Sequence, residues 1–161
     1  MKRLQWVALT AVVLTLALLG AGRVGLFSGK APTNLGVHSG RLAPPSTTPN
    51  SVSSQADLYP GHPQQTYARI APLQFSGDAT AAMHRLAGQI RQMPGATLVT
   101  TDATYLYAQF HTPWLGFVDD AEFWLEPARQ AIQVRSASRL GRSDFGVNRK
   151  RIETIRAALA R

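Results

Sequence analysis

Two short segments concentrate the side chains that could do chemistry. The segment DDAE, residues 119–122, supplies three carboxylates, and the segment RSASRLGRSDFGVNRKR, residues 135–151, holds six of the 17 Lys and Arg residues. Carboxylates act as general bases and bind hard cations such as Mg²⁺ and Ca²⁺, whereas arginines bind anions or stabilise developing negative charge. These two segments are where a site is expected.

A β-hairpin would bring the two segments together. Strands are predicted at residues 117–126 and 131–139, and a turn at 127–130 pairs Leu125 with Ile132, Phe123 with Val134 and Glu122 with Arg135. Alternation then places Asp119, Ser136 and Ser138 at the end of the core face, and Asp120, Glu122, Arg135 and Arg139 on the opposite face. A slip by one residue would exchange the two faces.

Each face allows two interpretations. Cross-strand pairs such as Glu122 with Arg135 commonly finish an exposed sheet face, and each contributes about 0.2–1 kcal/mol. Asp119 is more informative, because a carboxylate among core-facing residues needs partners. Ser136, Ser138 or an arginine of the following loop would supply them.

The loop at residues 139–148 precedes a predicted C-terminal helix. Ser143, Asp144 and Asn148 are candidates for its cap. If Asn148 is the cap, three cations fall in the first turn and oppose the helix dipole by about 0.3–1 kcal/mol each, which suggests acidic partners or a bound anion. If Asp144 is the cap, that argument weakens. The candidate binding residues are therefore Asp119, Asp120, Glu122, Arg135, Ser136, Ser138, Arg139, Ser143, Asp144, Asn148, Arg149 and Arg151.

The charge of the chain is uneven. The formal net charge is +8, and residues 135–161 carry eight cations against two acids, whereas residues 31–134 carry five cations against seven acids. Such asymmetry indicates an anionic partner or an internal acidic counterpart. The absence of Cys excludes disulfides and thiolate chemistry. No phosphate-binding loop or dinucleotide fingerprint is present.

The N-terminus reads as a membrane segment. Leu4 to Gly22 carry no charge, and these 19 residues would form a helix of about 28 Å, close to the ~30 Å of a bilayer core. The alternatives are an uncleaved anchor and a cleaved signal peptide, and the length favours the anchor. Lys2 and Arg3 place the N-terminus in the cytoplasm and the rest outside, although Arg23 and Lys30 weaken that inference. The expected location is the inner membrane, with a single span and an extracytoplasmic domain.

Three regions follow from the sequence. Residues 1–27 are the anchor or signal, 28–65 a linker and arm rich in Pro, Ser and Gly, and 66–161 a globular domain. Within the domain we expect strands at 67–73, 96–101 and 104–112, a helix at 78–93 capped by Asp78, and a helix from residue 147 onward. The predicted fold is α+β, an antiparallel sheet with two helices packed on one face, preceded by a transmembrane helix. The linker is either an extended tether or an ordered arm.

Three motifs carry a family resemblance. PNSVSSQA (49–56), GFVDDAEFWL (116–125) and VRSASRLGRSDFGVNRKRIETIR (134–156) resemble the family known as domain of unknown function 1499, from about residue 34 to the C-terminus. The resemblance implies a membrane-associated bacterial or plastid protein, and it implies no established activity. It also implies that 45–56 is an ordered arm. The family's linker motif has a Cys pair where this chain has Pro45 and Ser51, so no thiol role carries over.

Three function classes remain. The favoured one is a non-enzymatic binding or scaffold module whose Arg135, Arg139, Arg142, Arg149 and Arg151 surface binds an anionic ligand, a lipid headgroup or an acidic protein. The alternative is a hydrolase-type or metal-dependent enzyme that uses Asp119, Asp120 and Glu122 with Arg135 and Arg139. Nucleic acid is disfavoured by export and by the scarcity of aromatic residues among the cations. The sequence assigns no catalytic residue, no resident metal and no cofactor. Paired carboxylates would favour a structural role, and unpaired carboxylates in a pocket would favour catalysis.

Overall fold

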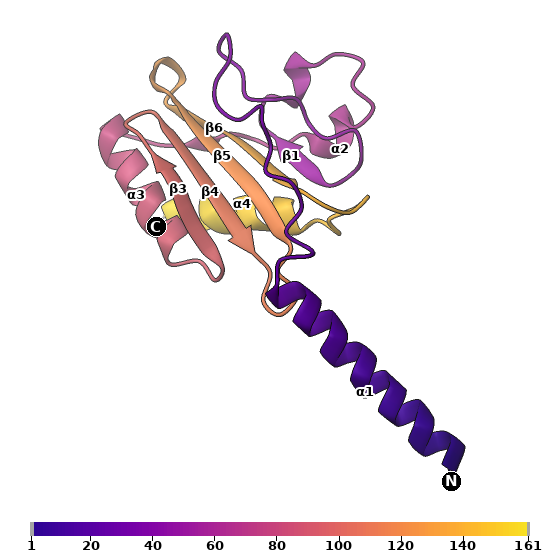
Figure 1. Cartoon of the computed structure of the whole chain (residues 1–161). Helices are drawn as coiled ribbons and strands as arrows, with labels where there is room; N and C mark the ends of the chain where they lie inside the picture. The colour runs from indigo at the N-terminus through magenta and orange to yellow at the C-terminus, as the bar shows by residue number, and fades with distance from the viewer. Residues whose placement is uncertain (1, 161) are drawn as a thin grey trace.

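The core of the domain is an open antiparallel sheet of six strands (Figure 1). The computed structural model describes residues 2–160. The strand order is β1–β6–β5–β4–β3, and β2 pairs with the same β6 strand as β1, at its other end. The strands are β1 (Ser51–Ser53), β2 (Leu73–Gln74), β3 (Ala96–Thr101), β4 (Tyr105–His111), β5 (Val118–Glu126) and β6 (Ala131–Ser138). The α+β prediction is confirmed.

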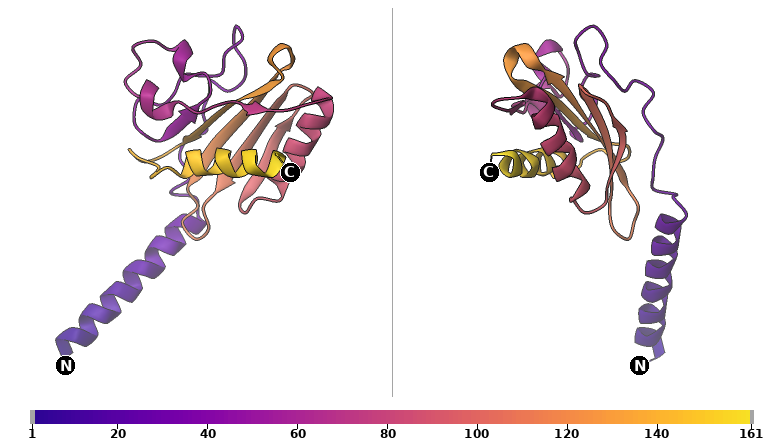
Figure 2. Two further views of the ribbon diagram at one scale, coloured as in Figure 1. Left: turned by 180° about the vertical axis from the view of Figure 1, so that it is seen from behind. Right: turned by 90° about the vertical axis from the view of Figure 1, so that its left-hand side faces the viewer.

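Two helices cover one face of this sheet (Figure 2). They are α3 (Ala79–Arg91) and α4 (Val147–Leu159). Asp78 caps α3 as predicted, because its side chain accepts a hydrogen bond of 2.7 Å from the backbone N–H of Ala81. Met83, Leu86 and Ile90 recur at helical spacing and are buried against the sheet. Burial of each such side chain stabilises the fold by about 1.5–3 kcal/mol.

The β5–β6 hairpin has the predicted register. Leu125 lies opposite Ile132, Phe123 opposite Val134 and Glu122 opposite Arg135. A short 3-10 helix, Pro127–Arg129, forms the turn, and Gln130 adopts the left-handed conformation that closes it. Asp119 and Ala121 therefore point to the helix-covered face of the sheet. Asp120 and Glu122 point to the opposite face.

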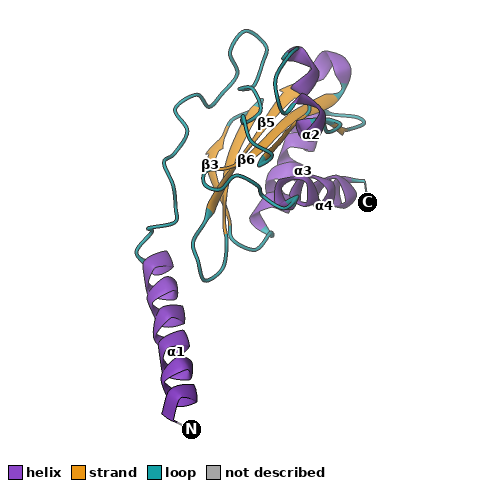
Figure 3. Ribbon diagram, turned by 90° about the vertical axis from the view of Figure 1, so that its right-hand side faces the viewer, coloured by secondary structure: helices purple, strands orange, loops and turns teal. Residues whose placement is uncertain are grey.

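An irregular segment covers the second face of the sheet, which the sequence had suggested to be exposed. We call residues 34–59 the arm; it includes β1 and a 3-10 helix, Ala56–Leu58. Leu42 in the arm is 1% exposed, whereas Val52 on β1 belongs to the core on the helix-covered face. The views along the sheet place the arm opposite α3 and α4 (Figure 2, right, and Figure 3). The sheet thus begins inside the range 28–65 that the sequence assigned to a linker and arm.

The prediction of a strand at residues 67–73 is wrong. Residues Gln65–Ala68 form a single helical turn, α2, and only Leu73 and Gln74 pair with β6. Pro72 has no N–H to donate to a ladder. The carbonyls of Tyr67 and Arg69 accept hydrogen bonds from the side chain of Arg149, and Arg69 forms only an isolated bridge with Ser53 of β1.

The N-terminal helix α1 (Lys2–Arg23) projects from the domain and is long and apolar enough to cross a membrane (Figure 1). Its C-terminal end packs on the loop between β4 and β5. A Cβ atom at Gly22 would lie 2.7 Å from the carbonyl oxygen of Leu115, so this contact requires glycine. The ring of Phe27 stacks on that of Phe117, with centroids 5.4 Å apart. A Cβ atom at Gly29 would lie 2.7 Å from Cβ of Arg139 and 3.1 Å from Cγ of Leu140. The segment that follows α1 is therefore in contact with two loops of the domain.

Candidate functional site

The predicted site residues form two buried networks, one on each face of the sheet. Successive residues of a strand point to opposite faces, so Asp119 joins the network under α4, and Asp120 and Glu122 join the network under the arm. The two networks also have different partners, from α4 in the first and from the arm in the second.

The first network centres on Arg151 of α4. Its Nη2 atom donates a hydrogen bond of 2.5 Å to Oδ2 of Asp119. Its Nη1 atom donates to Oγ of Ser136 at 3.0 Å and to Oδ1 of Asn148 at 2.6 Å. The guanidinium also lies over the ring of Phe110, 4.4 Å from the ring centre. The partners that the sequence required for a core-facing Asp119 are therefore present, although the arginine comes from the helix rather than from the loop.

Asn148 joins three parts of the fold. Its side chain is fully buried, and its Nδ2 atom donates to the carbonyl of Asn50 in the arm, to Oγ of Ser138 on β6 and to Oδ2 of Asp144. The side chain of Asn50 in turn donates to the carbonyl of Gly141. Asn148 lies inside the first turn of α4 and ties these parts together, so of the two caps that the sequence left open it is not the one used.

Gly146 occupies the N-cap position of α4, and the carboxylate of Asp144, two residues earlier, caps the helix. This carboxylate accepts hydrogen bonds from the backbone N–H groups of Gly146 and Asn148, both at 3.0 Å, and from the hydroxyl of Tyr67 at 2.7 Å. Burial opposes ionisation of Asp144, but the hydrogen bonds from Tyr67 and from these N–H groups outweigh it and hold the pKa below its ordinary value. A carboxylate at the N-terminus offsets the cations of the first turn. The cations of the first turn therefore no longer require a bound anion to explain them.

The second network begins with Asp120 and Arg139. Arg139 makes two hydrogen bonds of 2.8 Å to the carboxylate, and the hydroxyl of Tyr107 donates to Asp120 at 2.5 Å. The hydrogen bond to Asp120 raises the pKa of Arg139. The pKa of Tyr107 is also raised, mainly by burial and then by its hydrogen bond to Asp120. Gln109 donates to the Tyr107 hydroxyl at 2.8 Å, so Asp120, Arg139, Tyr107 and Gln109 hydrogen-bond to one another.

Glu122 is the most buried carboxylate of this network, at 0% exposure. Its Oε1 atom accepts from the backbone N–H of Gly36 at 2.7 Å and from the hydroxyl of Tyr105 at 2.8 Å. The Nη1 atom of Arg135 lies 3.6 Å from Oε2, which makes no hydrogen bond within the described residues 2–160. Burial lowers the pKa of Arg135 and the charge of Glu122 opposes that shift, while burial and Glu122 together raise the pKa of Tyr105.

This geometry argues for a structural role of the three carboxylates. They are divided between two faces, so they do not converge on one cation, and no group of three or more His, Cys, Asp or Glu side chains able to hold a metal occurs in residues 2–160. Each carboxylate faces an arginine. The enzyme hypothesis required unpaired carboxylates in a pocket, and that arrangement is not found among these three residues.

The predicted arginine surface also needs correction. Arg135, Arg139 and Arg151 have side chains at most 9% exposed and are paired internally. Arg149 is partly buried and donates to backbone carbonyls of residues 67 and 69. Of the five arginines assigned to that surface, Arg142 is the one classed as exposed in the described structure. The sequence could not separate internal from external arginines, because the arm that covers Arg135 has no regular hydrophobic period.

A cavity of about 360 Å³ lies between the end of the β5–β6 hairpin and the loop before α4. We call it the loop cavity. Four of the predicted site residues line it: Asp119, Ser138, Ser143 and Asp144. Its other lining residues are mainly apolar, namely Thr112, Phe117, Val118, Leu140, Gly141, Phe145 and Val147. None of the apolar ones was a predicted site residue, although Phe145, an aromatic residue between Asp144 and Gly146 in a polar loop, was a signal that could have been used.

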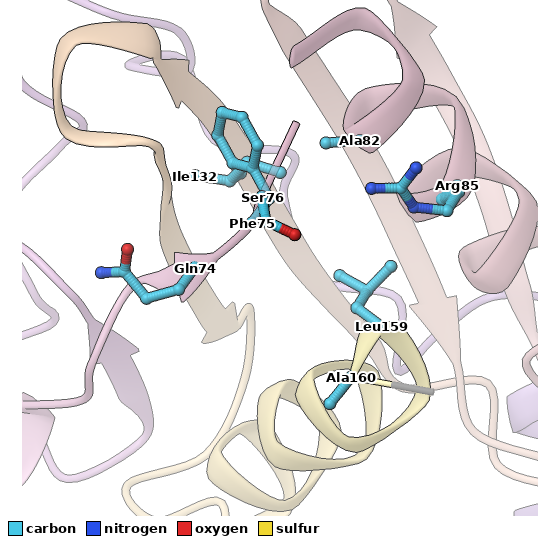
Figure 4. Close-up of a pocket in the computed structure, with 8 residues that line it drawn as sticks. All are labelled: Gln74, Phe75, Ser76, Ala82, Arg85, Ile132, Leu159 and Ala160. Atoms are coloured by element: carbon cyan, nitrogen blue, oxygen red, sulfur yellow. The ribbon is translucent and has the colours of Figure 1, made fainter. Parts of the chain in front are cut away.

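A second hollow of about 360 Å³ lies between β2, α3 and α4 (Figure 4). Phe75 and Ile132 line one side of it, and Arg85 of α3 and Leu159 of α4 line the other. None of the predicted site residues lines this hollow. The candidate site is therefore the loop cavity, where predicted residues and apolar walls meet.

These features define a small α+β domain, braced by buried ion pairs, that follows an apolar N-terminal helix. The family model described as "Protein of unknown function (DUF1499)" matches residues 41–159, and the chain belongs to this family. The resemblance drawn from the three motifs is thus confirmed, and the match includes part of the arm as well as the sheet. Comparison with curated proteins and with solved structures gave no match.

Proposed function

We propose that the protein is a single-pass membrane protein whose extracytoplasmic domain binds the surface of an anionic bilayer as a non-enzymatic module. The helix α1 would be the anchor, with Lys2 and Arg3 on the cytoplasmic side. The proposal replaces the arginine surface of the sequence analysis with a smaller surface at the end of the domain that contacts α1.

The contact between the juxtamembrane segment and two loops carries the proposal. Gly22 packs against Leu115, Phe27 stacks on Phe117, and Gly29 lies against Leu140. A transmembrane helix leaves the hydrocarbon region at its end, so the chain at residues 22–29 would lie among the headgroups. The loops at residues 112–117 and 139–147, which this chain contacts, would then lie at the same level.

The exposed side chains of these loops suit a membrane interface. Trp114 is 69% exposed and Phe145 is 94% exposed, and aromatic residues are favoured at the level of the headgroups. Arg23, Lys30 and Arg142 are exposed on the same segments. Each cation close to an anionic bilayer contributes about 1 kcal/mol of attraction. Aromatic insertion and headgroup attraction would act together.

The depth of single spin labels in nanodiscs tests the proposal. The chain has no cysteine, so Phe145→Cys and the matched control Leu58→Cys each give one labelled position in the full chain. In phosphatidylglycerol nanodiscs we expect the label at residue 145 to be shielded from an aqueous relaxation agent and accessible to oxygen, and the label at residue 58 to show the reverse. The shielding should weaken in phosphatidylcholine nanodiscs and at high salt. Equal exposure of both labels to water in every lipid would refute the proposal.

A further inference from the structure

The polar groups on the floor of the loop cavity already have partners. Asp119 is paired with Arg151, Asp144 accepts from Tyr67 and from two backbone N–H groups, and Ser138 accepts from Asn148. These hydrogen bonds use most of the polar capacity of the floor, so a polar ligand would gain little further affinity there, because hydrogen-bonding groups that are already paired offer little more.

The rim of the cavity, in contrast, holds apolar side chains in water. Leu140 is 41% exposed, Val147 is 46% exposed and Phe145 is 94% exposed. The backbone of Phe145 is in the left-handed region, with φ of 51°, which a bulky residue rarely adopts. The hydroxyl of Ser143 accepts a hydrogen bond from the N–H of Phe145, so the loop is tied in the shape that exposes the ring. Exposed apolar surface that the backbone maintains at a cost marks a contact site.

The position of the cavity identifies its apolar partner. Phe117 lines the cavity and is also the residue on which Phe27 stacks, and Leu140 lines it and contacts Gly29. The cavity wall is thus continuous with the segment that follows α1. The hydrocarbon region begins directly beneath the headgroups among which that segment would lie, and lipid acyl chains are its abundant apolar groups. A volume of about 360 Å³ falls at the lower end of the range for small-ligand pockets, about 300–1,000 Å³.

We propose that the loop cavity binds part of one acyl chain of a membrane lipid. This inference rests on the proposed function, since it needs the cavity to lie at the bilayer surface. The walls formed by Phe117, Val118 and Leu140 would hold the chain, and Phe145 would cover it from the outside.

Photo-crosslinking in nanodiscs tests the acyl site. The full chain is reconstituted with a phosphatidylglycerol that carries a diazirine in the middle of one acyl chain, and labelled peptides are mapped by mass spectrometry. Labelling of α1 by bulk lipid serves as the internal reference. We expect label on the cavity-lining residues 117, 118 and 140, at a ratio to α1 that falls about tenfold in Val147→Asp, because a carboxylate at the rim removes an apolar contact and is costly to bury.

The control variant is Val99→Asp, at an exposed position on β3 outside the loop cavity, and it should leave the ratio unchanged. An aspartate at residue 147 lies in the first turn of α4, where a negative charge is favourable, so this variant is expected to fold. Label confined to α1 and the outer ring of Phe145, or a ratio that Val147→Asp does not change, would overturn the acyl site. If either crosslinking result is found but the spin label at residue 145 is shielded from water, the proposed role at the membrane surface stands. If the spin label at residue 145 is open to water, both proposals are refuted.

Discussion

At the residue scale, three arginines of the segment 135–151 serve as partners of buried carboxylates. Arg151, Arg139 and Arg135 face Asp119, Asp120 and Glu122, respectively. A buried pair gains little over a well-packed apolar pair, but loss of one partner leaves an uncompensated charge in the interior. The pairing of opposite charges inside the fold therefore explains much of the clustering of cations and acids in these two segments of the sequence.

The pair of Asp119 and Arg151 gives the sharpest stability test. Arg151→Met should destabilise the protein by about 3–5 kcal/mol, because it strands the carboxylate of Asp119 among buried groups. Urea unfolding followed by fluorescence measures the change, and the exposed Arg142→Met is the matched control. The double variant Asp119→Asn with Arg151→Met should be less destabilised than the sum of the two single variants. Strict additivity would show that the two residues do not interact.

The cap at Asp144 gives a test with acid. The pKa of Asp144 is lower in the folded protein than its ordinary value of 3.8, so the folded state favours the ionised form. The contribution to stability is present above the unfolded pKa, near 4, and is lost as the pH falls through the lower folded pKa. At pH 7 Asp144→Ala should cost about 0.5–2 kcal/mol, as for other caps. This difference from the wild type should shrink below pH 4 in urea titrations, and a difference independent of pH would contradict the assignment.

At the element scale, the sequence predicted what has a regular period. The alternation in 117–126 and 131–139 was enough to predict the β5–β6 register, and the spacing of Met83, Leu86 and Ile90 was enough to predict α3. The arm has no such period. Its residues are held by individual contacts, such as the hydrogen bond from the N–H of Gly36 to Glu122, and these leave no repeat in the sequence. Without the arm, the polar residues beneath it look like a solvent-facing surface, and for that reason their burial was missed.

The arm should therefore be required for folding. A chain that begins at residue 31 keeps Leu42, Val52 and the hydrogen bond from Gly36 to Glu122, and we expect it to unfold cooperatively. A chain that begins at residue 66, where the sequence placed the start of the globular domain, would expose Glu122 and Arg135 and lose strand β1. We expect it to lack a cooperative thermal transition and near-ultraviolet circular dichroism. If both chains gave the same melting temperature, the arm would be a passive covering.

At the scale of the whole molecule, the sheet is the middle of three layers. The helices α3 and α4 cover one face and the arm covers the other (Figure 2). Asn148 hydrogen-bonds both to the arm and to β6, so one side chain of α4 links all three layers. The arm also connects α1 to the domain in the chain, and the contact of Gly22 with Leu115 adds a second connection in space. Two connections would fix the orientation of the domain relative to α1, whereas the chain alone would not.

A glycine pair within α1 tests whether that second connection holds the domain. A Cβ at Gly22 would lie 2.7–2.8 Å from backbone atoms of Leu115, whereas a Cβ at Gly20 would meet no atom within 4 Å. Gly22→Leu should therefore separate the helix from the β4–β5 loop, and Gly20→Leu should not. Spin labels at Val13→Cys and Val99→Cys, both exposed positions, report the distance between α1 and the sheet in nanodiscs. We expect a narrow distance distribution in the parent and in Gly20→Leu and a broad one in Gly22→Leu. A broad distribution in the parent would mean that the domain moves freely about the chain after α1, and the loops at residues 112–117 and 139–147 would then not be held at the bilayer.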